Sequence, residues 1–209
     1  MPSRRRLLIS SAVLGAAAAL PAHGQSAARP NPMPEELRKA LERDGNAPVL
    51  GNPDGDITLT EFFDYNCPFC KKMMGTIQQL IATDPRLRVV YREWPVFGED
   101  SEFAARASLA SLDQGRYWPL HAAMMTMRGR AAEPTVMRAV REVGLDEARL
   151  RRDMQSARVD RHIQRSFELA EHMGLVGTPS FIAGDEGVFG ALSLAEMRGL
   201  VARARETLG

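Results

Sequence analysis

The pattern that most constrains the fold lies between residues 56 and 94. Asp56–Phe63 alternates as a strand does, although Glu61 interrupts its apolar face. The apolar residues that follow Cys67 keep a helical spacing as far as Asp84-Pro85, and Leu87–Trp94 is predicted to be a second strand. Strand, helix and strand within about 40 residues form a βαβ unit, whose right-handed crossover makes the two strands parallel.

The rest of the chain is predicted to interrupt this sheet with helices and then to complete it. From Ser101 to Met173 the apolar spacing is helical, and no strand is convincing. A hairpin is then predicted, with a strand at Ser180–Ala183, a turn at Gly184–Gly187 and a short second strand at Val188–Phe189. A helix capped by Ser193 is predicted to follow it. The order predicts an α/β fold with an inserted all-helical domain.

The N-terminus has the features of an export signal. Arg4-Arg5-Arg6 precedes an uncharged run that ends in small residues, and we expect cleavage near Gly24. The arginines also fit a twin-arginine signal, so that route and the general secretory route stay open. We divide the chain into a signal peptide (1–24), a linker with a short helix (25–47), the first part of the fold (48–99), the helical insertion (100–173) and the second part of the fold (174–209).

Charge and hydropathy exclude some classes of partner. The chain has 27 Lys and Arg against 26 Asp and Glu, and residues 1–24 hold three of the arginines and no acid. The remaining net charge of about −2 gives no electrostatic basis for binding nucleic acid or an anionic membrane. Beyond the N-terminal run, no segment approaches the roughly 20 apolar residues of a spanning helix, so we expect no stable membrane anchor.

The 209 residues include only two cysteines, Cys67 and Cys70. Structural disulfides in exported proteins join distant segments, so a pair three residues apart indicates redox chemistry. Cys67 is predicted at the N-cap of a helix and Pro68 at its first residue, where unpaired N–H groups and the helix dipole favour a thiolate. We expect Cys67 to be exposed and to attack, and Cys70 to lie inside and to resolve the mixed disulfide, the pair forming a Cys67–Cys70 redox disulfide.

A metal or cofactor site fits these residues less well than a redox-active dithiol does. Zinc would need a second cysteine pair, and c-type haem would need His where Lys71 stands, so we expect neither a metal nor a cofactor. His121 with Met124, Met125 and Met127 could bind a soft metal such as Cu(I), but methionine on a helix more often fills a core.

Two segments resemble the DsbA-type family of thiol–disulfide oxidoreductases, Glu61–Lys71 and Gly177–Phe181. The resemblance implies a thioredoxin fold with a helical insertion, in the periplasm. It implies that Thr178-Pro179 is a cis peptide beside the sulfurs and that the backbone of Thr178 pairs with an extended substrate. It also implies that Glu61 is a buried acid that exchanges a proton with Cys70. Unfolded or misoxidised exported proteins would be the clients, and a membrane redox partner would reset the dithiol.

The sequence constrains the direction of electron flow between the dithiol and its clients less than it constrains the chemistry. Phe69 stands where the best-known oxidases of the family have His, and Thr178 is more typical of isomerase branches. We expect an oxidase, with an isomerase or reductase as the alternative and a periplasmic copper-binding or holding protein as an alternative of another class. Phe69 is also a candidate contact for unfolded clients.

Glu61 has an alternative to the buried role. Its carboxylate could reach solvent or pair with Lys71 or Lys72.

Overall fold

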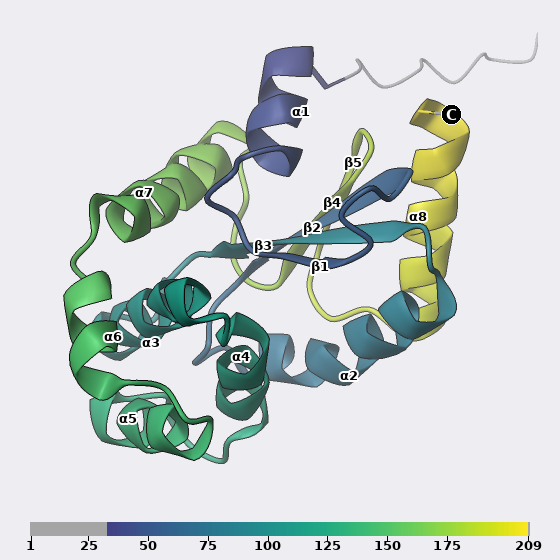
Figure 1. Cartoon of the computed structure of the whole chain (residues 1–209). Coiled ribbons are helices and arrows are strands. Elements are labelled where there is room, and N and C mark those ends of the chain that lie inside the picture. The colour runs from purple at the N-terminus through teal and green to yellow at the C-terminus, as the bar shows by residue number, and fades with distance from the viewer. Residues whose placement is uncertain (1–32, 209) are drawn as a thin grey trace, which may run out of the picture. The chain divides into compact units, whose positions relative to one another are not determined.

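A five-stranded mixed sheet lies at the centre of the structure (Figure 1). The structure is a computed structural model and describes residues 33–208. The strands are β1 (Val49–Gly51), β2 (Ile57–Phe63), β3 (Leu87–Glu93), β4 (Ser180–Ala183) and β5 (Glu186–Phe189), in the spatial order β1-β3-β2-β4-β5. β2 and β3 are parallel and the other pairs are antiparallel. The predicted βαβ unit is therefore confirmed, with α2 (Pro68–Thr83) as its crossover helix.

Helices cover both faces of the sheet. α2 and α8 (Leu194–Leu208) pack against the face that carries Leu59 and Phe63, and together they form the main hydrophobic core. α1 (Glu35–Glu42) and α7 (Ala157–His172) cover the opposite face, where Phe62 and Ile182 are buried. Because helices cover both faces of the sheet, its central strands β2 and β3 have no exposed residue.

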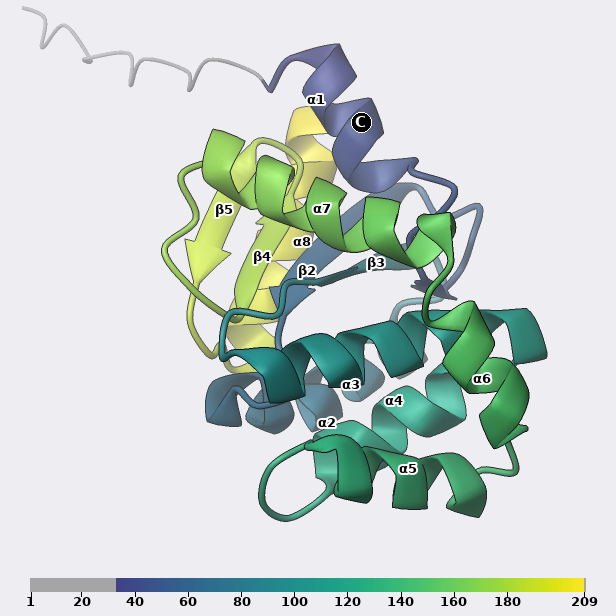
Figure 2. The same ribbon diagram turned by 90° about the vertical axis from the view of Figure 1, so that its left-hand side faces the viewer.

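The helical insertion separates β3 from β4. It consists of α3 (Glu99–Ala110), a short 3-10 helix (Ser111–Gln114), α4 (Tyr117–Thr126), α5 (Glu133–Glu142), α6 (Glu147–Asp153) and α7. Figure 2 shows α3 to α6 gathered at the end of the sheet where β2 and β3 finish, which is also where α2 begins. The predicted fold class, a thioredoxin fold with an inserted all-helical domain, is confirmed.

The structure differs from the prediction at two short elements. β1 was not predicted, because three residues are too few for an alternating pattern and Gly51 opens the sequence Gly-Asn-Pro-Asp-Gly, which is typical of a turn. Gly51 has φ +72°, and a Cβ there would lie 2.5 Å from the carbonyl oxygen of Leu87, so this edge strand needs glycine to approach β3. In the closing hairpin β5 begins at Glu186, which leaves Gly184-Asp185 as the turn instead of Gly184–Gly187.

The predicted signal peptide lies outside the described residues, as do residues 25–32 of the predicted linker. Between Met33 and Leu208, none of the helices combines the length and the hydropathy that crossing a bilayer requires.

Candidate active site

The start of α2 places the two cysteines. Cys67 is the N-cap, with extended backbone angles, and Pro68 follows as the first helical residue. The backbone N–H of Cys70 donates to Cys67 Sγ at 3.4 Å, so the sulfur accepts one of the N–H groups that a helix start leaves unpaired. Both cysteines are free thiols in the structure. The Phe69 side chain between them in sequence is 52% exposed.

The loop before β4 covers the first sulfur. The Thr178–Pro179 peptide bond is cis, as the resemblance implied, and Cys67 Sγ lies 3.2 Å from the carbonyl oxygen of Thr178, which accepts a hydrogen bond from the sulfur in its thiol form. Cys67 is only 1% exposed, so the expectation of an exposed first cysteine was wrong. The reason is tertiary, because helix geometry alone leaves the N-cap open and residues 111 positions later close over it.

The two sulfurs have opposite acidities. The pKa of Cys67 falls from 9.0 to about 6, mainly because the Cys70 thiol donates to it and also because the backbone N–H groups of Cys70 and Phe69 face it, although burial opposes this shift. The pKa of Cys70 rises strongly through burial, and its hydrogen bond to Cys67 and the Glu61 charge add to the rise. Near neutral pH the reduced site therefore holds one thiolate, on Cys67, and one thiol, on Cys70.

Glu61 lies behind the dithiol in the middle of β2. It is 1% exposed, and neither carboxyl oxygen has a hydrogen-bond partner within the described residues. Burial raises its pKa well above the usual range, and the Cys67 and Glu93 charges raise it further. The alternative pairing with lysine is wrong, because Lys71 Nζ donates to the carbonyl oxygens of Met127 and Gly129 and Lys72 Nζ lies over the Phe69 ring.

Asp64, which the sequence analysis missed, organises the loop that enters α2. Its Oδ1 accepts from the backbone N–H of Asn66 and from Ser101 Oγ. Its Oδ2 accepts from the backbone N–H groups of Val96 and Phe97 at 2.8 and 3.1 Å. An acid just before a turn is a recognisable pattern, but its partners Val96, Phe97 and Ser101 lie more than 30 residues away and leave no trace in the local sequence. Asp64 thus fixes the approach to Cys67 against the start of the insertion.

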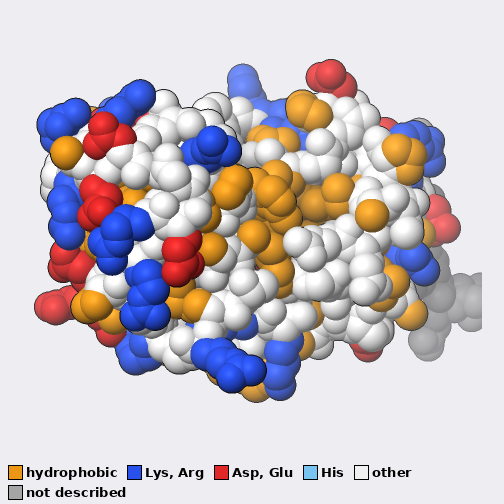
Figure 3. Space-filling model, turned by 60° about the horizontal axis from the view of Figure 1, so that its bottom comes forward, with side chains coloured by type: hydrophobic (Ala, Val, Ile, Leu, Met, Phe, Trp, Pro, Cys, Tyr) orange, Lys and Arg blue, Asp and Glu red, His pale blue; other side chains and the backbone are white. Residues whose placement is uncertain are grey.

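Exposed apolar side chains lie in the segments that form this site. Val96 and Phe97 belong to the loop that Asp64 holds, and Val176 precedes the cis peptide by two residues; these side chains are 40%, 47% and 80% exposed. In Figure 3 hydrophobic side chains gather towards the middle of the face, whereas most charged side chains lie towards one side. Large exposed apolar side chains on segments that enclose a reactive sulfur are typical of a contact surface for another chain.

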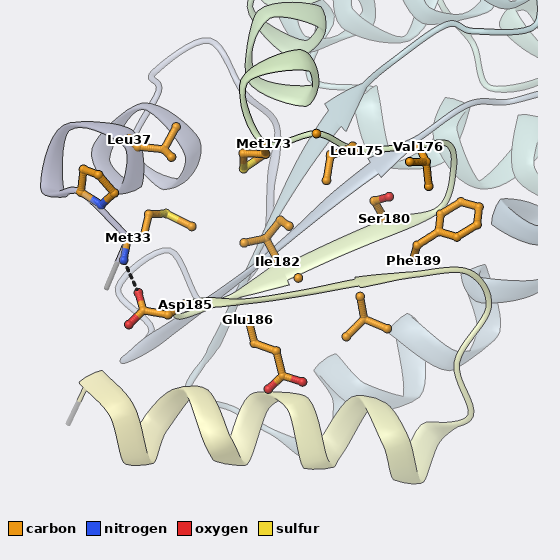
Figure 4. Close-up of a pocket in the computed structure, with 14 residues that line it drawn as sticks. Met33, Leu37, Met173, Leu175, Val176, Ser180, Ile182, Asp185, Glu186 and Phe189 are labelled. Atoms are coloured by element: carbon orange, nitrogen blue, oxygen red, sulfur yellow. Dashed lines mark hydrogen bonds between the residues drawn. The ribbon is translucent and has the colours of Figure 1, made fainter. Parts of the chain in front are cut away.

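A groove of about 450 Å³ runs along the β4–β5 hairpin, beneath α1 and the segment that joins α7 to β4. Figure 4 shows Val176 and Phe189 at one end of it, and Met33 with Asp185 at the other, where the backbone N–H of Met33 donates to Asp185 Oδ1. A Cβ on Gly177 would lie 3.1 Å from the Phe189 ring, so the groove adjoins the loop that covers Cys67.

The candidate copper ligands lie in the core. His121, Met124 and Met125 are buried and Met127 is partly buried against the same core, which agrees with the core-filling interpretation of the methionines. His121 Nδ1 is 2.9 Å from Tyr65 Oη, and burial lowers the pKa of His121 to about 3. Among the residues that the structure describes, no three His, Cys, Asp or Glu side chains are grouped as a metal site would require.

Comparison with known proteins places this geometry in a family. The model of the DSBA-like thioredoxin domain matches residues 58–202. The chain belongs to this family. As a DSBA-like thioredoxin domain it carries the thiol–disulfide oxidoreductase fold, and the match runs from β2, through the dithiol and the whole insertion, into α8.

Solved structures agree with this assignment. The DSBA-like chain is 51% identical to a thioredoxin-like oxidoreductase from Silicibacter pomeroyi DSS-3, with a TM-score of 0.80 and coverage of 81% of this chain and 98% of that one. It is 27% identical to the thiol-disulfide exchange protein alpha-DsbA2 from Wolbachia pipientis (TM-score 0.74; coverage 80% and 91%). A periplasmic thioredoxin-like protein from Salmonella enterica serovar Typhimurium is 26% identical (TM-score 0.76; coverage 84% and 99%).

The curated relatives are longer proteins. The DSBA-like chain is 31% identical over 134 residues to a Na(+)/H(+) antiporter NhaA from Herminiimonas arsenicoxydans, a match that covers 64% of this chain and 21% of the antiporter. The chain spans about a fifth to a quarter of the length of the curated relatives it matches.

Proposed function

We propose that the domain works as an oxidase, which accepts electrons from reduced thiols of exported proteins through Cys67 and Cys70. The observation that carries the proposal is the opposite acidity of the two sulfurs. A thiolate stabilised at Cys67 lowers the free energy of the reduced form, so the disulfide form becomes the stronger oxidant. A low pKa also makes Cys67 the better leaving group when a client disulfide is completed.

The chemistry has two exchange steps. In the first, a client thiolate attacks Cys67 Sγ, a client–Cys67 disulfide forms, and the Cys67–Cys70 bond breaks with Cys70 leaving as a thiolate that takes up a proton. In the second, another client thiolate attacks the client sulfur of the mixed disulfide, and Cys67 leaves as a thiolate. Two electrons pass to the dithiol, and the client gains one disulfide.

The supporting residues have separate roles in this proposal. Glu61 supplies the proton that Cys70 takes up, because it is the buried acid whose charge affects the acidity of Cys70. Pro68 fixes the helix start at Cys67, and Phe69 offers an exposed ring to unfolded clients. Thr178 and Pro179 hold the loop against Cys67 Sγ, where the Thr178 backbone would pair with an extended client.

The proposal places the domain in the periplasm. The N-terminal export pattern supports this location, and the Salmonella relative is described as periplasmic. The clients would be unfolded or misoxidised exported proteins, and a membrane redox partner would remove the two electrons after each cycle. The twin-arginine and general secretory routes both remain compatible with Arg4-Arg5-Arg6.

Oxidative refolding of a reduced model client tests the oxidase role. The oxidised domain should form client disulfides stoichiometrically, and the Cys67→Ser variant should leave only the uncatalysed background rate. Retention of the wild-type rate by Cys67→Ser would refute a role for this sulfur. An isomerase would instead rescue a scrambled, fully oxidised client when supplied in its reduced form. Thr178 and Phe69 favour that second candidate, and a stable oligomer in a solution mass measurement would strengthen it.

A further inference from the structure

A second buried acid lies beside Glu61 on the same face of the sheet. In the parallel register of β2 and β3, Glu61 is opposite Tyr91 and Phe63 is opposite Glu93. Opposite residues of paired strands share a face, so Glu93 is the diagonal neighbour of Glu61 on the side that faces α2 and α4. Glu93 is 1% exposed, like Glu61. Two carboxyl groups thus share one dry region behind the dithiol.

The two acids differ in their partners. Tyr117 Oη donates to Glu93 Oε1 at 2.9 Å, and His162 Nε2 lies 2.7 Å from Glu93 Oε2. Neither oxygen of Glu61 has a partner within the described residues. Tyr117 therefore donates a hydrogen bond to Glu93, and the His162 ring is in close contact with the other oxygen without the geometry of a hydrogen bond. Glu61 has no hydrogen bond among the described residues.

Other ionisable groups surround Glu93. They are Glu61 on β2, Tyr65 after it, Tyr91 and Arg92 on β3, Tyr117 on α4 and His162 on α7. The Arg92 guanidinium bonds to Asp44 Oδ2 and to the carbonyl oxygens of Ala40 and Leu41, which engages it with α1 on the other face. Tyr91 Oη has no partner in the described part of the chain. The partners closest to the Glu93 carboxylate are therefore His162 and Tyr117.

We propose that Glu93 is a positioning residue of the dithiol, whose carboxylate, anchored by Tyr117 and His162, keeps Glu61 protonated and so controls the proton exchange between Glu61 and Cys70. The physical reason is that two carboxyl groups close together in a dry interior cannot both ionise easily, so a charge on Glu93 opposes the ionisation of Glu61. The inference rests on the exchange chemistry proposed above, although it holds for either direction of electron flow.

The reaction cycle makes this influence most visible in the mixed disulfide. Burial, the Cys67 charge and the Glu93 charge all raise the pKa of Glu61. Once Cys67 is bonded to another sulfur it carries no charge, so Glu93 becomes the main charge that still acts on Glu61. In that state Cys70 must lose its proton to attack Cys67 Sγ, and the Glu61 carboxylate is the group that would accept it.

Stopped-flow reaction of the reduced domain with oxidised glutathione isolates this step. Cys67 first forms a mixed disulfide; Cys70 Sγ then bonds to Cys67 Sγ, its proton passes to Glu61, and glutathione leaves as a thiolate. At high oxidised glutathione the limiting rate reports the second step. Glu93→Gln should move its pH profile to lower pH by roughly half to one unit, because Glu61 ionises more easily. An unmoved profile, or a shift to higher pH, would overturn the inference.

Three further variants separate this effect from a general loss of packing. Glu93→Asp, which keeps the charge, should restore most of the wild-type profile. Adding Glu93→Gln to Glu61→Gln should cause no further shift, because the effect acts through Glu61. Glu42→Gln is the matched control, since Glu42 is a buried acid on α1 against the opposite face, and its profile should remain that of the wild type. A similar shift in Glu42→Gln, or an additional one in the double variant, would refute the mechanism.

The wild-type protein gives a test that needs no folded variant. Carboxyl-carbon NMR of the reduced domain should show the Glu61 resonance titrate over a broader pH range than one independent acid, because its ionisation is coupled to neighbouring charges. A titration curve of one independent acid would contradict the coupling. Exchange by Cys67 would still occur in that case, so failure of this inference is distinguishable from failure of the proposed function.

Discussion

Cys67 at the N-terminus of α2 and Glu61 on the sheet face behind it are equally buried, but burial has opposite chemical results in the two regions. At Cys67 a thiol and two backbone N–H groups face the sulfur, and its pKa falls to about 6. At Glu61 no donor is present among the described residues, and its pKa rises. The comparison teaches that the donors at a buried site, and not its depth, decide which protonation state the fold stabilises.

The largest expected effect comes from removing the second sulfur. Cys70→Ser should slow release of a mixed disulfide on the order of a thousandfold or more, because an external thiol must replace one held three residues away. When Cys70→Ser is mixed with a disulfide-bonded client, the Cys67 thiolate attacks the client disulfide and one client sulfur leaves as a thiolate. Non-reducing electrophoresis should reveal the covalent complexes through Cys67. If Cys70→Ser releases clients at the wild-type rate, the division of roles between the two sulfurs is wrong.

Replacing the acid without donors should stabilise the protein. The folded-state pKa of Glu61 is raised above its unfolded value, so native stability is lost as pH rises between the two values. Glu61→Gln cannot ionise, and it should therefore be more stable than the wild type by about 1–3 kcal/mol at pH 8 but nearly equal to it at pH 4. Urea unfolding at both pH values measures the difference. A loss of stability at pH 8 would mean that Glu61 has a partner.

The site with donors should show the opposite pH dependence. The folded-state pKa of Cys67 is depressed, so its contribution is present above the unfolded value and is lost as pH falls through about 6. Between pH 5 and pH 8 the reduced protein should gain about 1–2 kcal/mol of stability over the oxidised protein, allowing for solvent screening. Urea unfolding of both redox forms across this range measures it. A constant difference between the forms would contradict a stabilised thiolate.

The smallest effect is expected at the exposed ring between the sulfurs. Phe69→Ala removes a half-exposed side chain, so stability should change by less than about 0.5 kcal/mol. The Michaelis constant for an unfolded client should rise severalfold, whereas reaction with glutathione should be unchanged. Parallel assays with both substrates check this. Equal changes for client and glutathione would show that Phe69 acts on the sulfurs themselves.

The sequence was sufficient for the βαβ unit, the insertion and the dithiol, because each depends on spacing along one segment. Cys67 and Pro68 define a helix start. Glu61 interrupts an apolar face, and because burying a carboxyl group costs free energy, its presence there indicates a functional role. The cover over Cys67 could not be derived in this way, since it depends on where Thr178 is carried by the intervening helices.

The partners of the buried acids were likewise outside the reach of local patterns. Tyr117 and His162 meet Glu93 from two helices of the insertion, 24 and 69 positions further along the chain. Nothing in either helix distinguishes a tyrosine or histidine that bonds to a buried carboxylate from one that packs in the core. Only the folded structure brings these two side chains to the carboxyl group of Glu93.

Titration of the reduced protein by thiolate absorbance tests the central claim most directly. Between pH 4 and pH 8 the wild type should show one transition near pH 6, with the amplitude of a single thiolate, and Cys67→Ser should show none in this range. A midpoint near 9 for the wild type, or an equal transition in Cys67→Ser, would contradict the account of an activated Cys67 beside a protonated Cys70.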